Sequence, residues 1–194
     1  PAVVRIIEDL ESGEVSYGGR VTFMLGNVEA CRQNRRFIEA DLNRVFKHDL
    51  PDTLERRRSE ELMPVIAQSD LFIDFHQTIE ASNEPFWIFT FHTSGYYWAR
   101  LARGDTSLIT REPGIPFSQN SKCADEYARD LGIPALTLEM GQKGLTPEAE
   151  KLTYECMINA MSAMDEIAQG VSLSSLVEKR QASDLRFLEI QHAH

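Results

Sequence analysis

Apolar residues recur along the chain at two spacings, one typical of helices and the other of strands. Helical spacing in residues 1–14 predicts a helix that ends at Gly13. Residues 146–170 carry the clearest helix pattern, with Thr146 as the N-cap and methionines that are expected to fill the core. Further helices are predicted at residues 28–34, 51–69 with a bend or break at Pro64, 95–102, 121–132 and 172–180, and strands at residues 20–26, 71–75, 85–92, 106–110 and 133–141.

The predicted strands are continuous apolar runs, and they alternate with the predicted helices. This pattern predicts an α/β fold, namely a three-layer α/β/α sandwich with a mixed, mostly parallel sheet. Sheets of this kind bind ligands at the carboxyl ends of their strands. Two polar residues stand there, His76 after residues 71–75 and Glu139 after the apolar part of residues 133–141. We therefore expect His76 and Glu139 to lie close together.

The composition limits the classes of function. With 194 residues, of which 42% are hydrophobic, the chain can form one compact domain. A net charge of −10 argues against binding to a nucleic-acid backbone, and no apolar run is long enough to predict a membrane span. The cysteines Cys31, Cys123 and Cys156 are widely spaced, which argues against a disulfide framework or a thiolate metal site and favours a reducing cytoplasm.

The two strand-end residues each have a functional and a structural interpretation. Asp74 and His76 face the same side of a strand, so His76 is either a metal ligand oriented by Asp74 or a core histidine bonded to it. A carboxylate among apolar side chains exchanges protons nearer to neutral pH than a solvated one. Glu139 is thus either a general acid or base, or a surface residue paired with a lysine such as Lys143.

A polar loop, "RRFIEADLNRVF" at residues 35–46, is the third candidate. Arginines and an asparagine in a loop can bind carboxylates and orient an amide. The alternative is a set of ordinary solvated surface residues. On composition alone the sequence leaves both interpretations open.

Together, "EADLNRVF" (39–46), "DFHQT" (74–78) and "LTLEMG" (136–141) resemble the succinylglutamate desuccinylase/aspartoacylase family. The resemblance implies a zinc-dependent deacylase with a fold like that of the zinc carboxypeptidases. It covers roughly residues 1–170, which we expect to be a catalytic domain. Residues 171–194 would then be a linker or the start of a truncated C-terminal β domain.

The resemblance also implies a role for each matching residue. His76 matches a histidine ligand of a single zinc ion, and Glu139 matches the carboxylate that activates the zinc-bound water. Arg36 matches an arginine that polarises the scissile carbonyl and stabilises its oxyanion. Asn43 and Arg44 match residues that bind the carboxylates of the substrate. Asp41 and Asp74 would support the residues beside them.

The sequence departs from the family pattern at the metal site. In the family the other two zinc ligands come from an HxxE motif just before a helix, and that helix corresponds to residues 1–14 here. We therefore expect the remaining ligands upstream of Pro1, and weak or no zinc binding by residues 1–194 alone. The histidines that match no ligand position are His48, His92, His192 and His194.

A second departure concerns the substrate. Asp125 stands where related sequences often carry an arginine, and Lys122 or Arg129 could replace it. The resemblance implies hydrolysis of the amide bond of a small acidic N-acyl amino acid, such as N-succinylglutamate or N-acetylaspartate. The alternatives are a carboxypeptidase-like zinc peptidase or amidase and a metal-free domain that binds acidic ligands. Neither nucleic acid nor a membrane is expected as a partner, and a homo-oligomer stays open.

Overall fold

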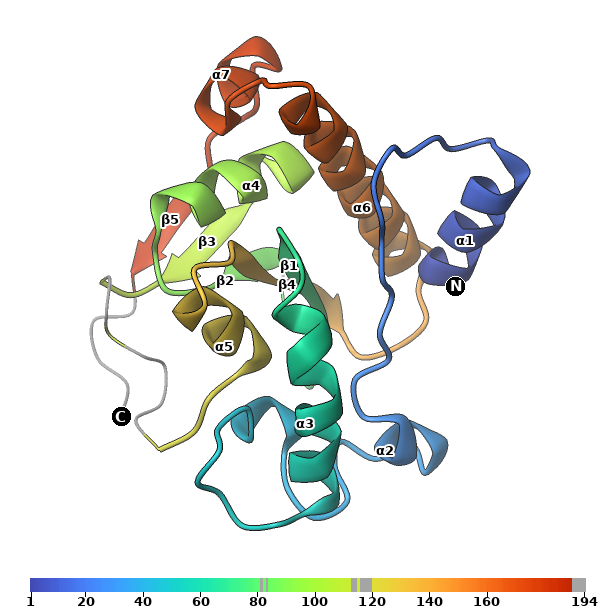
Figure 1. The fold of residues 1–194 in the computed structure, drawn as a ribbon, viewed down its shortest axis with the longest axis vertical. Coiled ribbons are helices and arrows are strands. Elements are labelled where there is room, and N and C mark those ends of the chain that lie inside the picture. Colours follow the sequence, from blue (N-terminus) through green and yellow to red (C-terminus); the bar gives the residue numbers. More distant parts are fainter. Residues whose placement is uncertain (81, 83, 113–114, 116–119, 190–194) are drawn as a thin grey trace. The chain divides into compact units, whose positions relative to one another are not determined.

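The computed structural model describes residues 1–80, 82, 84–112, 115 and 120–189 (Figure 1). Most of the predicted helices and strands are present, with boundaries that shift by a few residues. The helices are α1 (Ala2–Ser12), α2 (Val28–Arg32), the 3-10 helix η1 (Leu42–Arg44), α3 (Leu54–Ile66), α4 (Thr93–Arg103), α5 (Ala124–Asp130), α6 (Pro147–Ala168) and α7 (Leu173–Lys179), and the strands are β1 (Phe72–Thr78), β2 (Phe86–Ile88), β3 (Ser107–Thr110), β4 (Ala135–Gln142) and β5 (Arg186–Glu189).

The strands form a sheet in the order β1-β4-β2-β3-β5. Strands β2 and β3 are parallel, as are β3 and β5, whereas β2 and β4 are antiparallel. The Phe72 amide donates to the Pro134 carbonyl, and the Lys143 amide donates to the Thr78 carbonyl, so β1 and β4 run in the same direction. The predicted α/β fold with a mixed, mostly parallel sheet is therefore confirmed.

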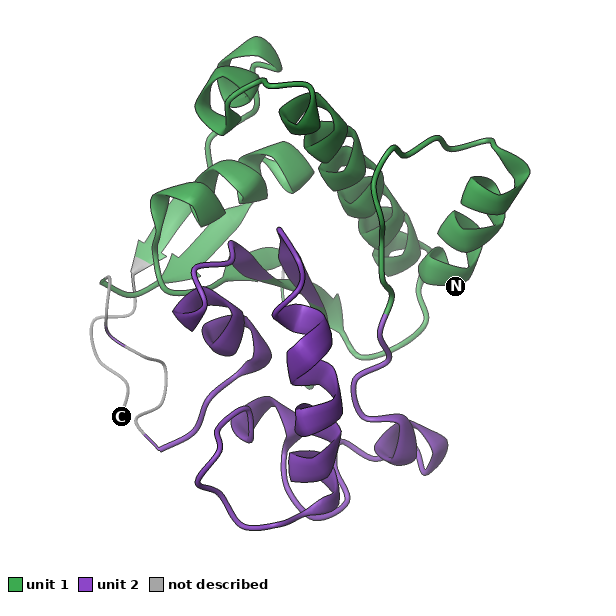
Figure 2. Ribbon diagram, in the orientation of Figure 1, with its two compact units in different colours: residues 1–23, 75–113, 137–194 green, residues 24–74, 114–136 purple. Residues whose placement is uncertain are grey.

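The chain divides into two compact units, coloured separately in Figure 2. Unit 1 consists of residues 1–23, 75–113 and 137–194, and unit 2 of residues 24–74 and 114–136. Strands β1 and β4 each begin in unit 2 and continue into unit 1. His76 and Glu139 thus belong to unit 1, and the polar loop at residues 35–46 belongs to unit 2.

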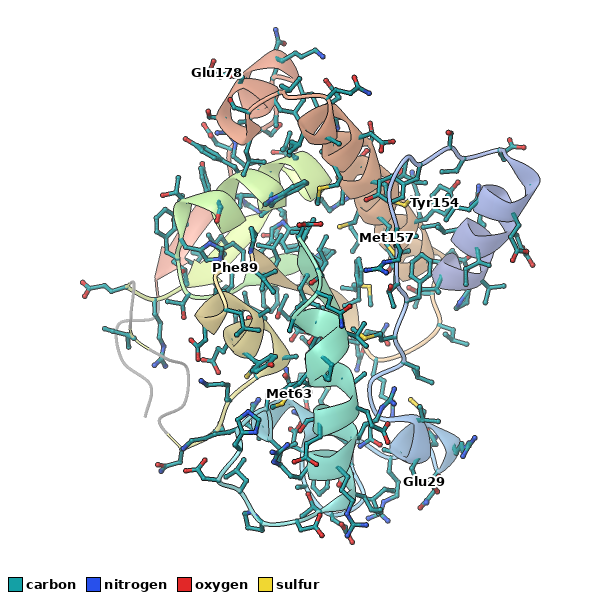
Figure 3. All side chains as sticks on the ribbon, in the orientation of Figure 1. Glu29, Met63, Phe89, Tyr154, Met157 and Glu178 are labelled. Carbon is teal, nitrogen blue, oxygen red and sulfur yellow. The ribbon has the colours of Figure 1, made fainter. Side chains whose placement is uncertain are left out.

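In unit 1, α6 packs against α1 through apolar side chains. Ile6 is fully buried in one cluster with Met157 and Met161. Figure 3 labels Met157 and Tyr154 on the side of α6 that faces α1, where the Tyr154 hydroxyl donates to Asp9 Oδ2 at 2.6 Å. The expectation that Met157, Met161 and Met164 of this helix fill the core is confirmed for Met157 and Met161, which are 8% and 7% exposed, whereas Met164 is only partly buried.

Unit 2 has its own core between α3 and α5. Met63, labelled in Figure 3, and Ile66 project from α3 into a cluster with Phe46, which ends the polar loop. Ala128 of α5 is fully buried in the same cluster. The loop at residues 35–46 is therefore attached at its carboxyl end to a packed core that α3 and α5 share.

The strand predicted at residues 20–26 is wrong, since none of these residues lies in a strand or bridge. The carbonyls of Leu25 and Gly26 instead accept hydrogen bonds from the guanidinium of Arg58, at 2.7 and 2.9 Å. A side chain from α3 thus takes the place of a neighbouring strand. In the same helix, Pro64 lies in the last turn and does not break it, because α3 continues to Ile66.

The segment after α6 contributes α7 and β5, and β5 pairs with β3 from Ser107↔Arg186 to Thr110↔Glu189. The predicted domain boundary at residue 170 and the start of a further β domain stay predictions. None of the helices in the described part of the chain has the length and apolar content to cross a membrane.

Candidate active site

His76 and Glu139 face each other on neighbouring strands of unit 1. His76 lies on β1, and its Nδ1 is 3.8 Å from Oε1 of Glu139 on β4. This separation is too long for a direct hydrogen bond between these two atoms. The side chains are 31% and 17% exposed, respectively, so both can reach a solute. The expectation that the two lie close together therefore agrees with the geometry, whereas their chemical roles stay predictions.

Strand pairing explains why Glu139 is neither solvated nor fully buried. In the register of β4 with β2, Glu139 pairs with Phe86, and the preceding Leu138 pairs with Trp87. Directly paired residues share a face of the sheet, and successive residues alternate between faces. Leu138 and Trp87 are both fully buried. The alternation therefore places the Glu139 carboxylate on the opposite, more open face, beside the Phe86 ring.

The polar loop of unit 2 is held by Asp41. Its Oδ2 accepts hydrogen bonds from Nε and Nη2 of Arg36, at 3.1 and 2.8 Å. Its Oδ1 accepts from the Asn43 amide at 3.0 Å and so caps the 3-10 helix η1. One carboxylate thus fixes Arg36, whose side chain is 56% exposed, relative to Asn43. These contacts are those expected of a structural support.

Asn43 and Arg44 join the loop to the start of α5, which lies about eighty positions further along the chain. Asn43 Oδ1 accepts from the Ala124 amide at 2.9 Å, while Arg44 Nη1 donates to its neighbour's carbonyl at 2.6 Å and to Cys123 Sγ at 3.5 Å. Two further backbone bonds, Phe46 N to Lys122 O and Lys122 N to Arg44 O, close the junction. The Asn43 side chain therefore has a structural role here, whereas Arg44 is exposed.

The thiol of Cys123 does not offer a nucleophile at this junction. Burial, followed by the nearby carboxylates of Asp125 and Glu126, raises the pKa of Cys123 to about 12. The thiol is thus protonated at neutral pH, whereas only the deprotonated thiolate acts as a nucleophile.

The two cations proposed to replace a missing substrate arginine are both paired inside unit 2. Lys122 Nζ forms an ion pair with Asp130. Arg129 Nη1 donates to Asp125 Oδ2 at 2.7 Å and to the Ala135 carbonyl at 3.3 Å, and its side chain is only 13% exposed. Arg129 thus neutralises Asp125, and its burial does not suit a substrate contact.

His76 and Glu139 fit only part of a zinc site. An imidazole beside a carboxylate suits zinc, and catalytic zinc typically takes three protein ligands. Over residues 1–80, 82, 84–112, 115 and 120–189, no group of three or more His, Cys, Asp or Glu side chains could hold a metal ion. The pair therefore offers at most one histidine ligand with a carboxylate beside it.

The remaining histidines lie elsewhere. His92 Nδ1 accepts a hydrogen bond from the Gly95 amide at 3.0 Å and caps α4. His48 is exposed in the loop after η1. His192 and His194 lie outside the described residues.

Comparison with known proteins shows the family. The sequence model described as the succinylglutamate desuccinylase/aspartoacylase catalytic domain matches residues 2–164. A curated succinylglutamate desuccinylase from Pseudomonas paraeruginosa is 34% identical over 154 residues, which cover 71% of this chain and 45% of the relative. The chain therefore belongs to the succinylglutamate desuccinylase/aspartoacylase catalytic-domain family.

Solved structures agree on the fold. A structure of succinylglutamate desuccinylase from Vibrio cholerae superposes with a TM-score of 0.72 at 20% identity, over 98% of this chain and 57% of that chain. The corresponding protein from Vibrio parahaemolyticus gives a TM-score of 0.73 at 18% identity. The chain spans about half the length of the curated relatives it matches.

Proposed function

We propose that this chain is the catalytic part of a zinc-dependent hydrolase that removes the acyl group from a small acidic N-acyl amino acid. The observation that carries the proposal is the 3.8 Å approach of His76 to Glu139 on neighbouring strands of a chain in this family. A metal ligand and a base must share one water molecule, and side chains this close can do so. The names of the curated relatives support N-succinylglutamate as the first substrate to test.

In this proposal His76 is one of the ligands of the zinc ion. When bound, zinc would supply a water molecule with its pKa lowered to about 7. Glu139 would accept a proton from a water molecule held beside His76 and would return it to the leaving amine, because its carboxylate lies 3.8 Å from the imidazole and is partly buried. Phe86, the cross-strand partner of Glu139, lies on the same face of the sheet as the carboxylate.

The loop in unit 2 is proposed to provide positive charges for an acidic substrate. Arg36, oriented by Asp41, is proposed to stabilise the negative charge that develops on the carbonyl oxygen. Arg44 is proposed to bind a carboxylate of the substrate. Asn43 is proposed to fix the backbone from which Arg44 projects, through the bond of its Oδ1 to the Ala124 amide. The NH2 group of the Asn43 side chain is proposed to contact the substrate. An acidic protein needs such local arginines to attract an acidic ligand.

The test is zinc content and hydrolysis by the protein produced from its complete gene. Stoichiometric zinc together with hydrolysis of N-succinylglutamate or N-acetylaspartate would support the proposal. Zinc with cleavage of short peptides alone would indicate a carboxypeptidase-like enzyme. Binding of acidic ligands without zinc would replace the proposal with a metal-free binding domain.

The substitution Arg44→Ala is expected to raise KM about tenfold or more with a smaller change in kcat, because a carboxylate contact is present in both ground and transition states. Steady-state kinetics with N-succinylglutamate measures both constants. Arg32→Ala is the matched control, since Arg32 is 73% exposed in the same unit and pairs only loosely with Glu29 at 3.5 Å. A loss confined to kcat would show that Arg44 acts on the reacting atoms instead.

A further inference from the structure

Glu55 is a carboxylate buried beneath the polar loop of unit 2. It lies in the first turn of α3 and is only 1% exposed. Its Oε1 accepts hydrogen bonds from the Ile38 amide at 2.6 Å and from Asn27 Nδ2 at 3.0 Å. Its Oε2 accepts from the next two amides, Glu39 at 3.2 Å and Ala40 at 3.1 Å. Both oxygens of Glu55 are therefore fully engaged by donors from the loop and from Asn27.

The three amides are consecutive and lie between Arg36 and Asp41, the ion pair that closes the loop. A second contact joins the loop to the helix, because Glu39 Oε2 of the loop accepts a hydrogen bond from the Leu54 amide at 2.6 Å and so caps α3. The loop and the first turn of α3 thus hold each other through two carboxylates. Burial raises the pKa of Glu55, but the hydrogen bonds from Ile38, Asn27, Ala40 and Glu39 outweigh it, so the pKa lies below its ordinary value.

We infer that Glu55 is a positioning residue, which sets the conformation of residues 36–44 and thereby the placement of Arg36 and Arg44 on an acidic substrate. This inference rests on the proposed function. Glu55 is too deeply buried to touch the substrate, and it acts through the backbone of residues 38–40. Displacement of a charged group by about 1 Å can lower a catalytic rate by as much as about a hundredfold.

The inference depends on the charge of Glu55 as well as on its shape. In Glu55→Gln, one of the two accepting oxygens becomes an NH2 donor and faces backbone N–H groups. One end of the loop therefore loses its acceptor, although the volume of the side chain is nearly unchanged. In Glu55→Asp the charge is kept but the carboxylate withdraws by one methylene, so we expect partial retention of the bonds.

The experiment compares Glu55→Gln and Glu55→Asp with the wild type and with Glu61→Gln. Glu61 lies on the same helix and is 66% exposed, so its variant controls for loss of a negative charge on α3. Hydrogen exchange of residues 36–46 is measured by mass spectrometry, and kcat and KM are measured with N-succinylglutamate. In Glu55→Gln we expect exchange at residues 38–40 to accelerate at least about tenfold, and kcat/KM to fall about ten- to a hundredfold with a raised KM.

The two readouts separate the inference from the function on which it rests. Partial recovery of KM and of exchange in Glu55→Asp would support positioning, because a global loss of folded protein lowers the active fraction and leaves KM unchanged. Unchanged hydrogen exchange in Glu55→Gln, or kinetic constants equal to those of Glu61→Gln, would overturn the inference. In that case an active wild-type protein would leave the proposed function standing. A wild-type protein that holds zinc but hydrolyses no N-acyl amino acid would refute the proposed function, and the inference with it.

Discussion

Glu139→Gln is expected to reduce kcat by about 10²–10⁴-fold while leaving zinc bound, which is the loss typical of removing a general base. The glutamine amide has nearly the size of the carboxylate, so the packing against Phe86 and the register of β4 with β2 are expected to persist. What is lost is the ability to accept a proton. Because His76 is untouched, the residue proposed as the metal ligand on β1 keeps its position.

The measurement is kcat for N-succinylglutamate together with zinc content and the free energy of unfolding. Glu178→Gln, on the exposed surface of α7 in the same unit, is the control for removal of one carboxylate (Figure 3). A Glu139→Gln variant with wild-type turnover would show that another group takes the proton. Loss of zinc along with activity would instead make Glu139 a metal ligand.

The approach of His76 to Glu139 could be predicted because it follows from local patterns. Both residues interrupt apolar runs, and apolar runs of this length become buried strands. In a mostly parallel sheet the carboxyl ends of neighbouring strands lie together, so the two polar side chains were expected at one edge. The structure adds that β1 extends beyond the predicted residues 71–75 to Thr78, so that His76 lies within a strand, as Glu139 does in β4.

The role of Glu55 could not be predicted in the same way. In the sequence Glu55 is an acidic residue in the first turn of a helix, which is sufficiently explained by the helix dipole. Its four donors come from residues 15–28 positions away, and nothing in a linear pattern indicates which amides a carboxylate will accept. The failed strand prediction at residues 20–26 has a similar origin, since the carbonyls of Leu25 and Gly26 accept hydrogen bonds from Arg58, a residue more than thirty positions away.

The burial of Arg129, which argues against the suggested replacement of a substrate arginine, could not be predicted for a related reason. On a helical pattern, Asp125 and Arg129 are one turn apart, which is the spacing of an ordinary surface ion pair. Only the packing of α5 shows that both side chains are buried, at 8% and 13% exposure. Burial makes the removal of one partner alone costly, because the other is left as an unpaired buried charge.

Asp125→Ala is accordingly expected to lower the free energy of unfolding by about 3–5 kcal/mol, because it leaves the buried guanidinium of Arg129 without its carboxylate. Arg129→Met is expected to cost less. The reason is that Asp125, left alone in Arg129→Met, can take up a proton and become neutral, whereas Arg129, left alone in Asp125→Ala, stays charged. The double variant removes both charges and should recover part of the loss. Unfolding in urea, followed by circular dichroism, measures all three.

The pH dependence of Arg129→Met provides the sharper test of this explanation. Burial, opposed by Arg129, already raises the pKa of Asp125, and removal of the guanidinium raises it further. A raised folded-state pKa favours the folded state at low pH and loses that benefit as pH rises. The deficit of Arg129→Met should therefore shrink as the pH falls. The exposed pair Arg57–Asp52, at 62% and 71% exposure, is the control, and Asp52→Ala should change stability far less. Equal losses for Asp125→Ala and Asp52→Ala would show that burial does not govern the strength of this pair.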